Sequence, residues 1–569
     1  MTGEERAGFM IIAVAHGYLL RGTGSNLYVS NLCRTFCRQG HRVLLFSQEE
    51  EPAAFDFISR SEEFNEDNRS TNVIMQRKTN YPGSCVHYRP NLGGMLPVYV
   101  YDRYKGFEVK EFPSLSEKEI EDYLEKNSLA LLNAFKNSSP DLVLSQHTIM
   151  QPVYTARALA QFGGEARHLA TVHGSALNFS VRKSNLLRRY ALEGIRGVDG
   201  LVFVSSHSRS DFITYFSDVP DLADKCRVIF AGVNTELFQP LESPDQKAEK
   251  VAELKGLLKK PTAEKKGGKE ASDKEEFYGL VQAVSNSEEI RDLIADYRDH
   301  FDAWSPDGDA TANLNKIDWA REKIVLYYGK YLWTKGIHLL IAALPLVLQK
   351  HPHTRLILVG FGAAREYLEA LVGVLDQGRI DLALEMIERP KYFSAAGTES
   401  AEEEGIYSEG LKKLLADQSN VSLYREACQG KIRKKIVFTG IMDHEQLKKL
   451  IPCADVAVVP SIFPESFGLV GVEALACGVL PVQTYHSGFA DVVDVYQETF
   501  RDVFKEVGVK RLTLDENLVT GLADNIKGLL GYLEEITAEE RANLAKKAHL
   551  LAEKHSSWDM IAERYLEDR

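Results

Sequence analysis

The chain has 569 residues, of which 44% are hydrophobic and 26% charged, so it can supply the cores of two or three globular domains. Its formal net charge of −13 argues against a general nucleic-acid-binding protein, and any site for a phosphorylated ligand must therefore be basic locally. Seven scattered cysteines without a Cys-x-x-Cys pair are typical of reduced thiols in a cytoplasmic protein. The acidic start and the lack of an apolar run of about eighteen residues predict neither a signal peptide nor a transmembrane helix.

The chain opens with a strand–loop–helix–strand pattern. Residues 9–15 form an apolar run typical of a buried parallel strand, and apolar residues at helical spacing over 27–37 precede a second strand at 42–47. Between the first strand and the helix stand Gly22 and Gly24. A glycine loop before a helix N-terminus often holds a phosphate or sugar, although a flexible turn is an equally good explanation of these two glycines alone.

Further strands are expected at residues 141–145, 168–172 and 201–206. His173 follows the second of these, at the carboxyl end of a predicted parallel strand, where α/β proteins bind ligands. A buried structural histidine is the alternative for an isolated case. Residues 49–115 are predicted to be an irregular insertion, in which 97–104 is either an edge strand or part of an acceptor-binding wall.

Basic residues are concentrated at 182–189, from Arg182 to Arg189. The interpretation we favour is a solvated helix face. The alternative is a contact with a phosphorylated acceptor or with anionic lipid at the inner membrane face.

Two charged segments interrupt the pattern. Residues 241–275 are predicted to be mobile or loosely helical, and 276–322 helical, with a turn rather than a calcium loop at 304–309. Residues 376–434 form a second helical insertion. The sequence assigns no function to either segment.

A second strand–loop–helix pattern begins at residue 323. A strand at 324–328 leads into Lys330 and Lys335, which are either phosphate ligands or two solvated lysines. The next strand ends at Gly360 and Gly362, again at the edge where ligands bind.

A loop with two prolines follows the strand at 455–459 and precedes a helix expected to begin near Ser466, a good N-cap residue type. The free amides of Phe467, Gly468 and Leu469 would then face an anion. Glu465 stands just before this helix and Glu473 inside it, and carboxylates suit pairs of sugar hydroxyls. The plainer alternative is an ordinary helix N-terminus with one more surface glutamate.

The Glu465–Glu473 pair, with seven residues between its members, resembles the Glu-x7-Glu signature of the retaining glycosyltransferases of family 4, the group 1 glycosyltransferases. The opening glycine loop, the His173–Gly174 pair and the segment from Lys330 to Gly336 resemble other elements of that family. The resemblance covers residues 9–47, 141–238, 323–362 and 436–565. It is weaker at Lys330, where the family has arginine, and at 231–234, where Ala231 and Asn234 replace the usual residues.

The resemblance implies an α/β protein with the GT-B fold, in which two Rossmann-like domains with parallel sheets face each other across a cleft. The expected division is an acceptor domain at 1–240, an insertion at 241–322, a donor domain at 323–554 and a C-terminal helix at 555–569 that crosses back to the first domain. The catalytic group is expected to comprise His173, Lys330, Lys335 and Glu465. Donor-binding residues are expected to be Gly22, Gly24, Gly360, Gly362, Ser466, Phe467, Gly468, Leu469 and Glu473.

The implied activity is transfer of a hexose from a nucleotide-diphosphate sugar to a hydroxyl of a glycan, lipid or small molecule, with retained anomeric configuration. The two lysines would neutralise the diphosphate, so that neither a metal nor a cofactor is required. Alternatives are a GT-B relative such as a nucleotide-sugar epimerase or a glycan phosphorylase, and a catalytically inactive nucleotide-sugar-binding scaffold. The sequence does not specify the base, the sugar, the acceptor or the oligomeric state.

Overall fold

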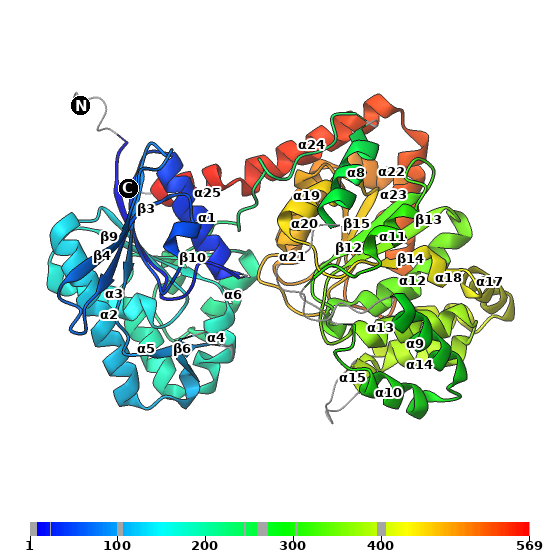
Figure 1. Cartoon of the computed structure of the whole chain (residues 1–569), viewed down its shortest axis with the longest axis horizontal. Helices are drawn as coiled ribbons and strands as arrows, with labels where there is room; N and C mark the ends of the chain where they lie inside the picture. Colours follow the sequence, from blue (N-terminus) through cyan, green and yellow to red (C-terminus); the bar gives the residue numbers. More distant parts are fainter. Residues whose placement is uncertain are drawn as a thin grey trace. The chain divides into compact units, whose positions relative to one another are not determined.

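The structure, a computed structural model, describes residues 8–22, 24–99, 106–243, 246–258, 271–301, 305–394 and 405–567. It divides into two compact units (Figure 1). Unit 1 comprises Met1–Gly232 and Ser556–Arg569, and unit 2 comprises Val233–His555.

Unit 1 is built on a sheet that, in the described residues, has nine strands in the order β11-β10-β9-β8-β1-β2-β5-β3-β4. All neighbouring pairs are parallel except β3 and β4. A separate parallel pair is formed by β6 and β7. The strands are β1 (Ile11–Ala15), β2 (Arg42–Phe46), β3 (Ile58–Phe64), β4 (Thr71–Gln76), β5 (Ser84–Arg89), β6 (Met95–Val98), β7 (Glu108–Glu111), β8 (Leu142–Gln146), β9 (Arg167–Val172), β10 (Gly200–Phe203) and β11 (Cys226–Val228).

The helices of unit 1 connect these strands and bury one face each. They are α1 (Ser25–Arg38), α2 (Glu117–Ser138), α3 (Gln151–Phe162), α4 (Ser175–Phe179), α5 (Asn185–Arg196), α6 (Ser206–Tyr215), α7 (Leu222–Lys225) and α25 (Trp558–Leu566), with short 3-10 turns at Pro52–Ala54, Phe112–Ser114 and Val181–Lys183. In α2, Ser116 and Glu119 form a reciprocal capping box that satisfies amides at the helix start.

Helix α25 at the end of the chain packs on α1 near its beginning, and Figure 1 shows the two side by side. The hydroxyl of Tyr565 lies 3.0 Å from that of Tyr28 and 2.7 Å from Oγ1 of Thr171. Arg38 forms an ion pair with Asp559 at 2.7 Å. The C-terminal segment therefore contributes to the core of unit 1.

Unit 2 is built on a parallel sheet with the order β14-β13-β12-β15-β16 in the described residues. Its strands are β12 (Lys323–Tyr328), β13 (Thr354–Val359), β14 (Ile436–Phe438), β15 (Val456–Val459) and β16 (Pro481–Gln483). The strands are short apolar runs, as expected where helices cover both faces of a parallel sheet.

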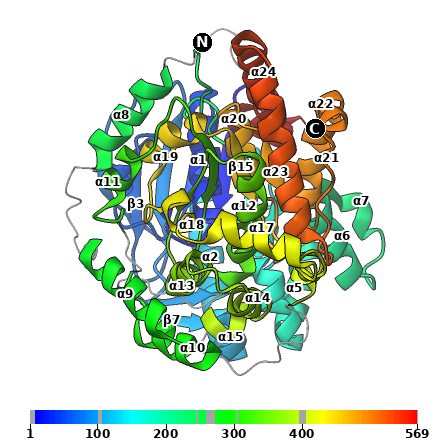
Figure 2. The same ribbon diagram turned by 90° about the vertical axis from the view of Figure 1, so that its right-hand side faces the viewer.

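The first helices of unit 2 come from the segment before the sheet. They are α8 (Gln246–Leu258), α9 (Ala271–Ala283), α10 (Ser287–Asp296) and α11 (Ala310–Asn315), which Figure 2 shows along one side of the unit. The remaining helices are η5 (Trp333–Lys335), α12 (Ile337–Lys350), α13 (Arg365–Asp376), α14 (Ile380–Glu388), α15 (Pro390–Ser394), η6 (Gly405–Ser408), α16 (Glu409–Leu415), α17 (Gln418–Cys428), α18 (Ile432–Lys435), α19 (His444–Leu450), η7 (Ile451–Cys453), α20 (Leu469–Ala476), α21 (Phe489–Thr499), α22 (Arg501–Val507), α23 (Leu518–Glu535) and α24 (Ala538–Ser556).

The structure corrects two sequence-based expectations for the insertions. Residues 49–115 are not irregular, because β3, β4 and β5 extend the main sheet of unit 1. Residues 246–258 are not loose, because α8 packs on α19 with Val251 and Leu254 buried. Of the predicted edge strand at 97–104, residues 97 and 98 belong to β6, whereas 100–104 lie outside the described residues.

Candidate functional site

The predicted donor-binding residues of unit 2 lie at one edge of its sheet. Because β12, β13, β15 and β16 are parallel neighbours, the loops that follow them meet at their carboxyl ends. These loops carry Lys330 and Lys335, Gly360 and Gly362, and the 460–468 segment. The backbone joins two of them, since the amide of Ile462 donates to the carbonyl of Thr334 at 2.9 Å.

Lys335 and Glu465 form a direct ion pair. The hydroxyl of Ser461 donates to the same carboxylate at 3.3 Å, and the amide of Glu465 donates to Oγ of Ser487 at 2.9 Å. The side chains of Lys335 and Glu465 keep 28% and 25% of their exposed surface. A ligand can therefore reach both charges, although each is oriented by protein contacts.

Gly336 allows the two loops to approach this closely. Its φ of +68° is in the left-handed region, and a Cβ added there would overlap the carbonyl oxygen of Pro460. The glycine after Lys335 thus has a packing reason that does not depend on a ligand.

The helix that follows begins later than the sequence suggested. Helix α20 starts at Leu469, and its N-cap is Gly468 with a φ of +98°, so Ser466 is not the N-cap. The ring of Phe489 occupies the position that a Cβ on Gly468 would take. The first helical amides are therefore those of Leu469 and Val470, whereas Ser466, Phe467 and Gly468 belong to the preceding loop.

Glu473 lies one turn inside α20, beside Tyr328 of β12. Burial raises the pKa of its carboxyl group to about 7, and a hydrogen bond with Tyr328 offsets part of that shift. The Tyr328 hydroxyl also donates to the carbonyl of Val470 at 2.7 Å, which ties the strand to the first turn of the helix. Glu473 can thus change its charge near neutral pH.

Other predicted residues at this edge have different surroundings. Lys330 is exposed, and the hydroxyl of Tyr327 donates to its carbonyl at 2.9 Å. Gly360 and Gly362 have φ values of +156° and +139°, and Cβ atoms there would collide with the backbone of Gly329 and Tyr331. Both glycines are explained by loop packing, and their donor-binding role stays a prediction.

In unit 1, histidines follow three neighbouring strands of the sheet. His16 follows β1, His147 comes just after β8, and His173 follows β9. The ring centroids of His147 and His173 are 5.0 Å apart, and Nε2 of His173 lies 2.8 Å from Oε1 of Gln146. The sequence reasoning singled out only His173. The signal that could have found the others is their shared position at the carboxyl end of a strand.

These histidines are held neutral. Burial lowers the pKa of His16 to about 4 and that of His173 to about 3, and it lowers the pKa of His147 well below its usual value. Within the described part of unit 1, both ring nitrogens of His147 and Nδ1 of His16 are buried without a hydrogen-bond partner, as are Nε2 of Gln146 and Oγ1 of Thr148. Buried polar groups normally have partners, so five such atoms close together are unusual for a protein interior.

The glycine loop of unit 1 lies next to this cluster. Gly22 and Gly24 have φ values of +110° and +61°, and Gly24 is the N-cap of α1. Asn26 in the first turn of α1 contacts Nε2 of His16 at 3.0 Å. Thr23 lies outside the described residues.

The basic run at 182–189 is paired with acidic side chains. Arg182 contacts both carboxylate oxygens of Asp211 at 2.7 Å, and Arg188 contacts Asp218 at 2.5 Å. Arg189 pairs with Glu117. A peripheral membrane contact through this run stays a prediction. No helix within the described ranges is long and apolar enough to cross a membrane.

Two family models match the chain. The model "Glycosyltransferase Family 4" matches residues 22–237, and "Glycosyl transferases group 1" matches residues 310–379 and 411–548. Together they cover most of the chain, and they exclude much of the two charged insertions.

Among curated proteins, an uncharacterized glycosyltransferase of Methanocaldococcus jannaschii is 28% identical over 172 residues, which is 30% of this chain and 30% of that protein. A glycogen synthase of Mycobacterium tuberculosis is 26% identical over 223 residues, 39% of this chain and 37% of the relative. The matched part of the chain thus spans about a third of the length of these relatives.

Among solved structures, the catalytic domain of starch synthase IV from Arabidopsis thaliana, bound to ADP and acarbose, has a TM-score of 0.52 at 15% identity, covering 99% of this chain and 98% of that one. This similarity concerns the fold. Because the two family models match both units and both main sheets are parallel apart from the β3–β4 pair, the chain belongs to the group 1 glycosyltransferases and has their GT-B fold.

Proposed function

We propose that the protein is a retaining glycosyltransferase that moves a hexose from a nucleotide-diphosphate sugar to an acceptor hydroxyl. The observation that carries this proposal is the ion pair between Lys335 and Glu465, which lies in the loop that leads into α20, the helix that carries Glu473. A cation, free helix amides and two carboxylates at one sheet edge match the parts of a nucleotide-diphosphate sugar.

The diphosphate would be held by Lys335, by the exposed Lys330 and by the amides of Leu469 and Val470. Ammonium groups and the positive end of a helix stabilise the charge that develops on a leaving phosphate. Transfer would need no added metal ion. Donor binding would draw Lys335 toward the phosphate, which frees Glu465 to accept hydrogen bonds from sugar hydroxyls.

Glu473 would accept hydrogen bonds from the ribose hydroxyls. His173 would brace the transferred sugar and would not act as a base, because its pKa of about 3 keeps the ring neutral and weakly basic. The leaving phosphate would then take the proton of the acceptor hydroxyl on the face where the new bond forms, which retains the anomeric configuration.

The test begins with a thermal-shift screen of the whole chain against UDP-, GDP- and ADP-sugars, followed by transfer assays with the best donor. Lys335→Ala and Glu473→Ala should each reduce transfer by about tenfold or more. Lys505→Ala, which removes an exposed lysine on α22, should leave transfer unchanged. Turnover at the parental rate in both site variants, or conversion of the donor alone to its epimer, would contradict the proposal.

A further inference from the structure

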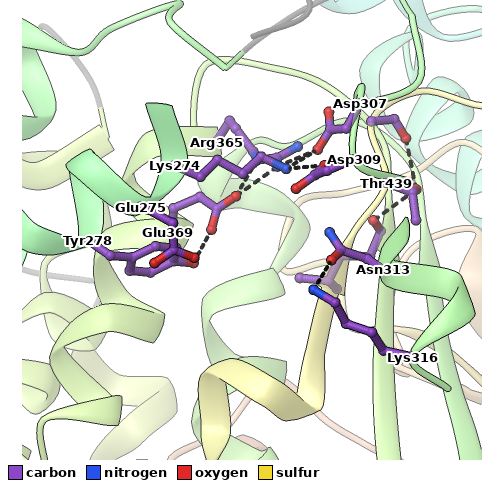
Figure 3. A network of polar contacts seen from close by, with 12 residues as sticks. Lys274, Glu275, Tyr278, Asp307, Asp309, Asn313, Lys316, Arg365, Glu369 and Thr439 are labelled. Atoms are coloured by element: carbon purple, nitrogen blue, oxygen red, sulfur yellow. Dashed lines mark hydrogen bonds and ion pairs between the residues drawn. The ribbon is translucent and has the colours of Figure 1, made fainter. Parts of the chain in front are cut away.

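A cavity of about 530 Å³ in unit 2 contains none of the predicted site residues. It lies along the edge strand β14, between α9 and α11 of the first insertion and the α13 and α18 helices. Figure 3 labels several of its polar lining residues, among them Lys274, Asp309, Asn313 and Lys316. This volume is in the range of pockets that bind small organic molecules.

One part of the lining is apolar or aromatic. Tyr278 of α9 is buried, and Ile436, Val437 and Phe438 of β14 are buried opposite the insertion. The guanidinium of Arg433 lies 3.9 Å from the ring centroid of Tyr278. Such a surface suits the carbon skeleton of a ligand and is larger than an inorganic anion needs.

The carboxylates of the lining already have donors. Asp309 pairs with Lys274 at 2.8 Å, and Glu369 pairs with Arg365 at 2.7 Å and accepts from Tyr278. Asp376 accepts from the amide of Arg433 at 3.1 Å. Asp309 and Glu369 therefore add little net negative charge, whereas Asp376 keeps its charge because its donor is a neutral amide. The remaining lone pairs of these carboxylates can accept hydrogen bonds from hydroxyls.

Two basic residues of the lining, Lys316 and Lys434, have no carboxylate partner. Both are exposed, and in the part of unit 2 that the structure describes neither has a carboxylate within ion-pair distance. Nζ of Lys316 donates to Oδ1 of Asn313 at 2.9 Å. The backbone carbonyls of both lysines accept hydrogen bonds from Arg355, which fixes the backbone from which the two ammonium groups extend. The lining carries five basic and four acidic side chains, a small excess of positive charge in a chain with a net charge of −13.

We propose that this cavity binds a small phosphorylated sugar, at a site separate from the predicted transfer site. Lys316 and Lys434 would hold the phosphate, and ammonium groups without carboxylate partners are suited to that role. Asn313 and the lining carboxylates would contact hydroxyls, and the Tyr278–β14 wall would cover the ring. This binding depends on the insertion helices and is independent of whether the chain transfers a hexose.

A buried ionic network forms the base of this site. Lys274 and Arg365 both contact Oδ2 of Asp307 at 2.8 Å, and the amide of Asp307 donates to the carbonyl of Thr439 at 2.8 Å. Figure 3 shows this chain of contacts. Because the partners of each charge are already in place, the wall of the cavity is preorganised for a ligand.

The test is isothermal titration calorimetry on the full chain with glucose 6-phosphate, fructose 6-phosphate, mannose 6-phosphate and glucose 1-phosphate, and with glucose and inorganic phosphate as separate probes. At least one sugar phosphate should bind more tightly than glucose or phosphate. Lys316→Ala combined with Lys434→Ala should weaken that binding by about tenfold or more, and the paired Arg substitutions should restore most of it.

A matched control removes two exposed lysines elsewhere in unit 2, Lys413→Ala with Lys505→Ala, and it should bind like the parent. Equal thermal midpoints of the two double variants exclude unfolding as the cause. The proposal is overturned if no sugar phosphate binds, if inorganic phosphate binds equally well, or if both double variants bind alike. It is also overturned if Lys335→Ala abolishes binding while Lys316→Ala/Lys434→Ala does not, since the probe would then occupy the predicted transfer site.

Discussion

If Glu473 binds the ribose of the donor as proposed, the protonation state of its carboxyl group should affect donor binding. Its pKa is raised to about 7 by burial, and its neighbours include Tyr328 and Cys477, whose own pKa values are raised. Ribose hydroxyls donate to a carboxylate, so donor binding should favour the ionised form. Affinity for the nucleotide sugar should therefore increase from about pH 6 to pH 8, by up to roughly tenfold per unit below the pKa. In calorimetric titrations over the same pH range, the donor affinity of Glu473→Gln should not change with pH. If the affinity of the variant changes with pH as in the parent, another group causes the pH dependence.

The same shift predicts an effect on stability. Folding raises the pKa of the Glu473 carboxyl group from 4.5 to about 7. The protonated group therefore contributes its full stabilisation below pH 4.5, and this stabilisation is lost as the pH rises through about 7. Glu473→Gln should therefore gain thermal stability relative to the parent when the pH is raised from about 5 to 8, by on the order of 2 kcal/mol. Unfolding midpoints of both proteins at the two pH values test this, and a difference independent of pH would argue against a buried ionisable carboxyl.

In the proposed function, Glu465 and the donor diphosphate would compete for the ammonium group of Lys335, because Lys335 already pairs with Glu465. Glu465→Gln removes the competing carboxylate, so the affinity for a nucleoside diphosphate without sugar should rise by up to about fivefold. This factor corresponds to the free energy that a partly exposed ion pair typically contributes. Transfer should fall, because the sugar loses a charged acceptor. Titration with the diphosphate alone, together with the transfer assay, separates the two effects, and a decrease in both would show that Glu465 mainly supports the loop.

At the scale of elements, the packing of two loops depends on Gly336. In Gly336→Ala the added methyl group meets the carbonyl of Pro460 and the left-handed backbone is strained, so the loops should separate and donor binding should fall by about tenfold or more. Gly508→Ala is a matched control, since Gly508 has a φ of +69° and open space around its Cβ position. That change should cost only about 1 kcal/mol in stability and leave donor binding unchanged. Equal effects of the two substitutions would show that strain alone, and not the loop contact, matters.

The elements also show how far the sequence could predict the fold. Apolar runs such as those of β1, β8 and β12 predicted buried parallel strands, because both faces of such strands are covered. Strand β3, with the sequence ISRSEEF, was missed because its charged residues lie toward the edge of the sheet, next to the exposed β4. The start of α20 was misplaced because Gly468 takes a left-handed conformation that residue preference alone does not reveal.

Part of the candidate site could also be predicted from the sequence, because parallel strands bring the loops that follow them together. Lys335 and Glu465 lie in recognisable strand–loop–helix patterns, so the approach of these two residues follows from parallel strand order. The shared role of Glu473 stays a prediction. The partners of His173 could not be found in this way, because His16 and His147 come from separate segments and are brought together only by the order β9-β8-β1. Tyr328 was likewise missed, since a tyrosine at the end of a buried strand has no motif of its own.

At the scale of the whole molecule, the last helix belongs to the unit that contains the first strand. Trp558 packs so closely on Gly232 that a Cβ there would overlap the indole ring, and Ile561 and Tyr565 are fully buried. Trp558→Ala should therefore lower the stability of unit 1 by about 3–5 kcal/mol, whereas Glu563→Ala on the exposed face of the same helix should change it little. Hydrogen exchange with mass spectrometry can report the two units separately, and faster exchange is expected in β1, β9 and α1 but not in β12 or β13. The reverse distribution, or equal exchange in both variants, would mean that α25 is not part of the core of unit 1.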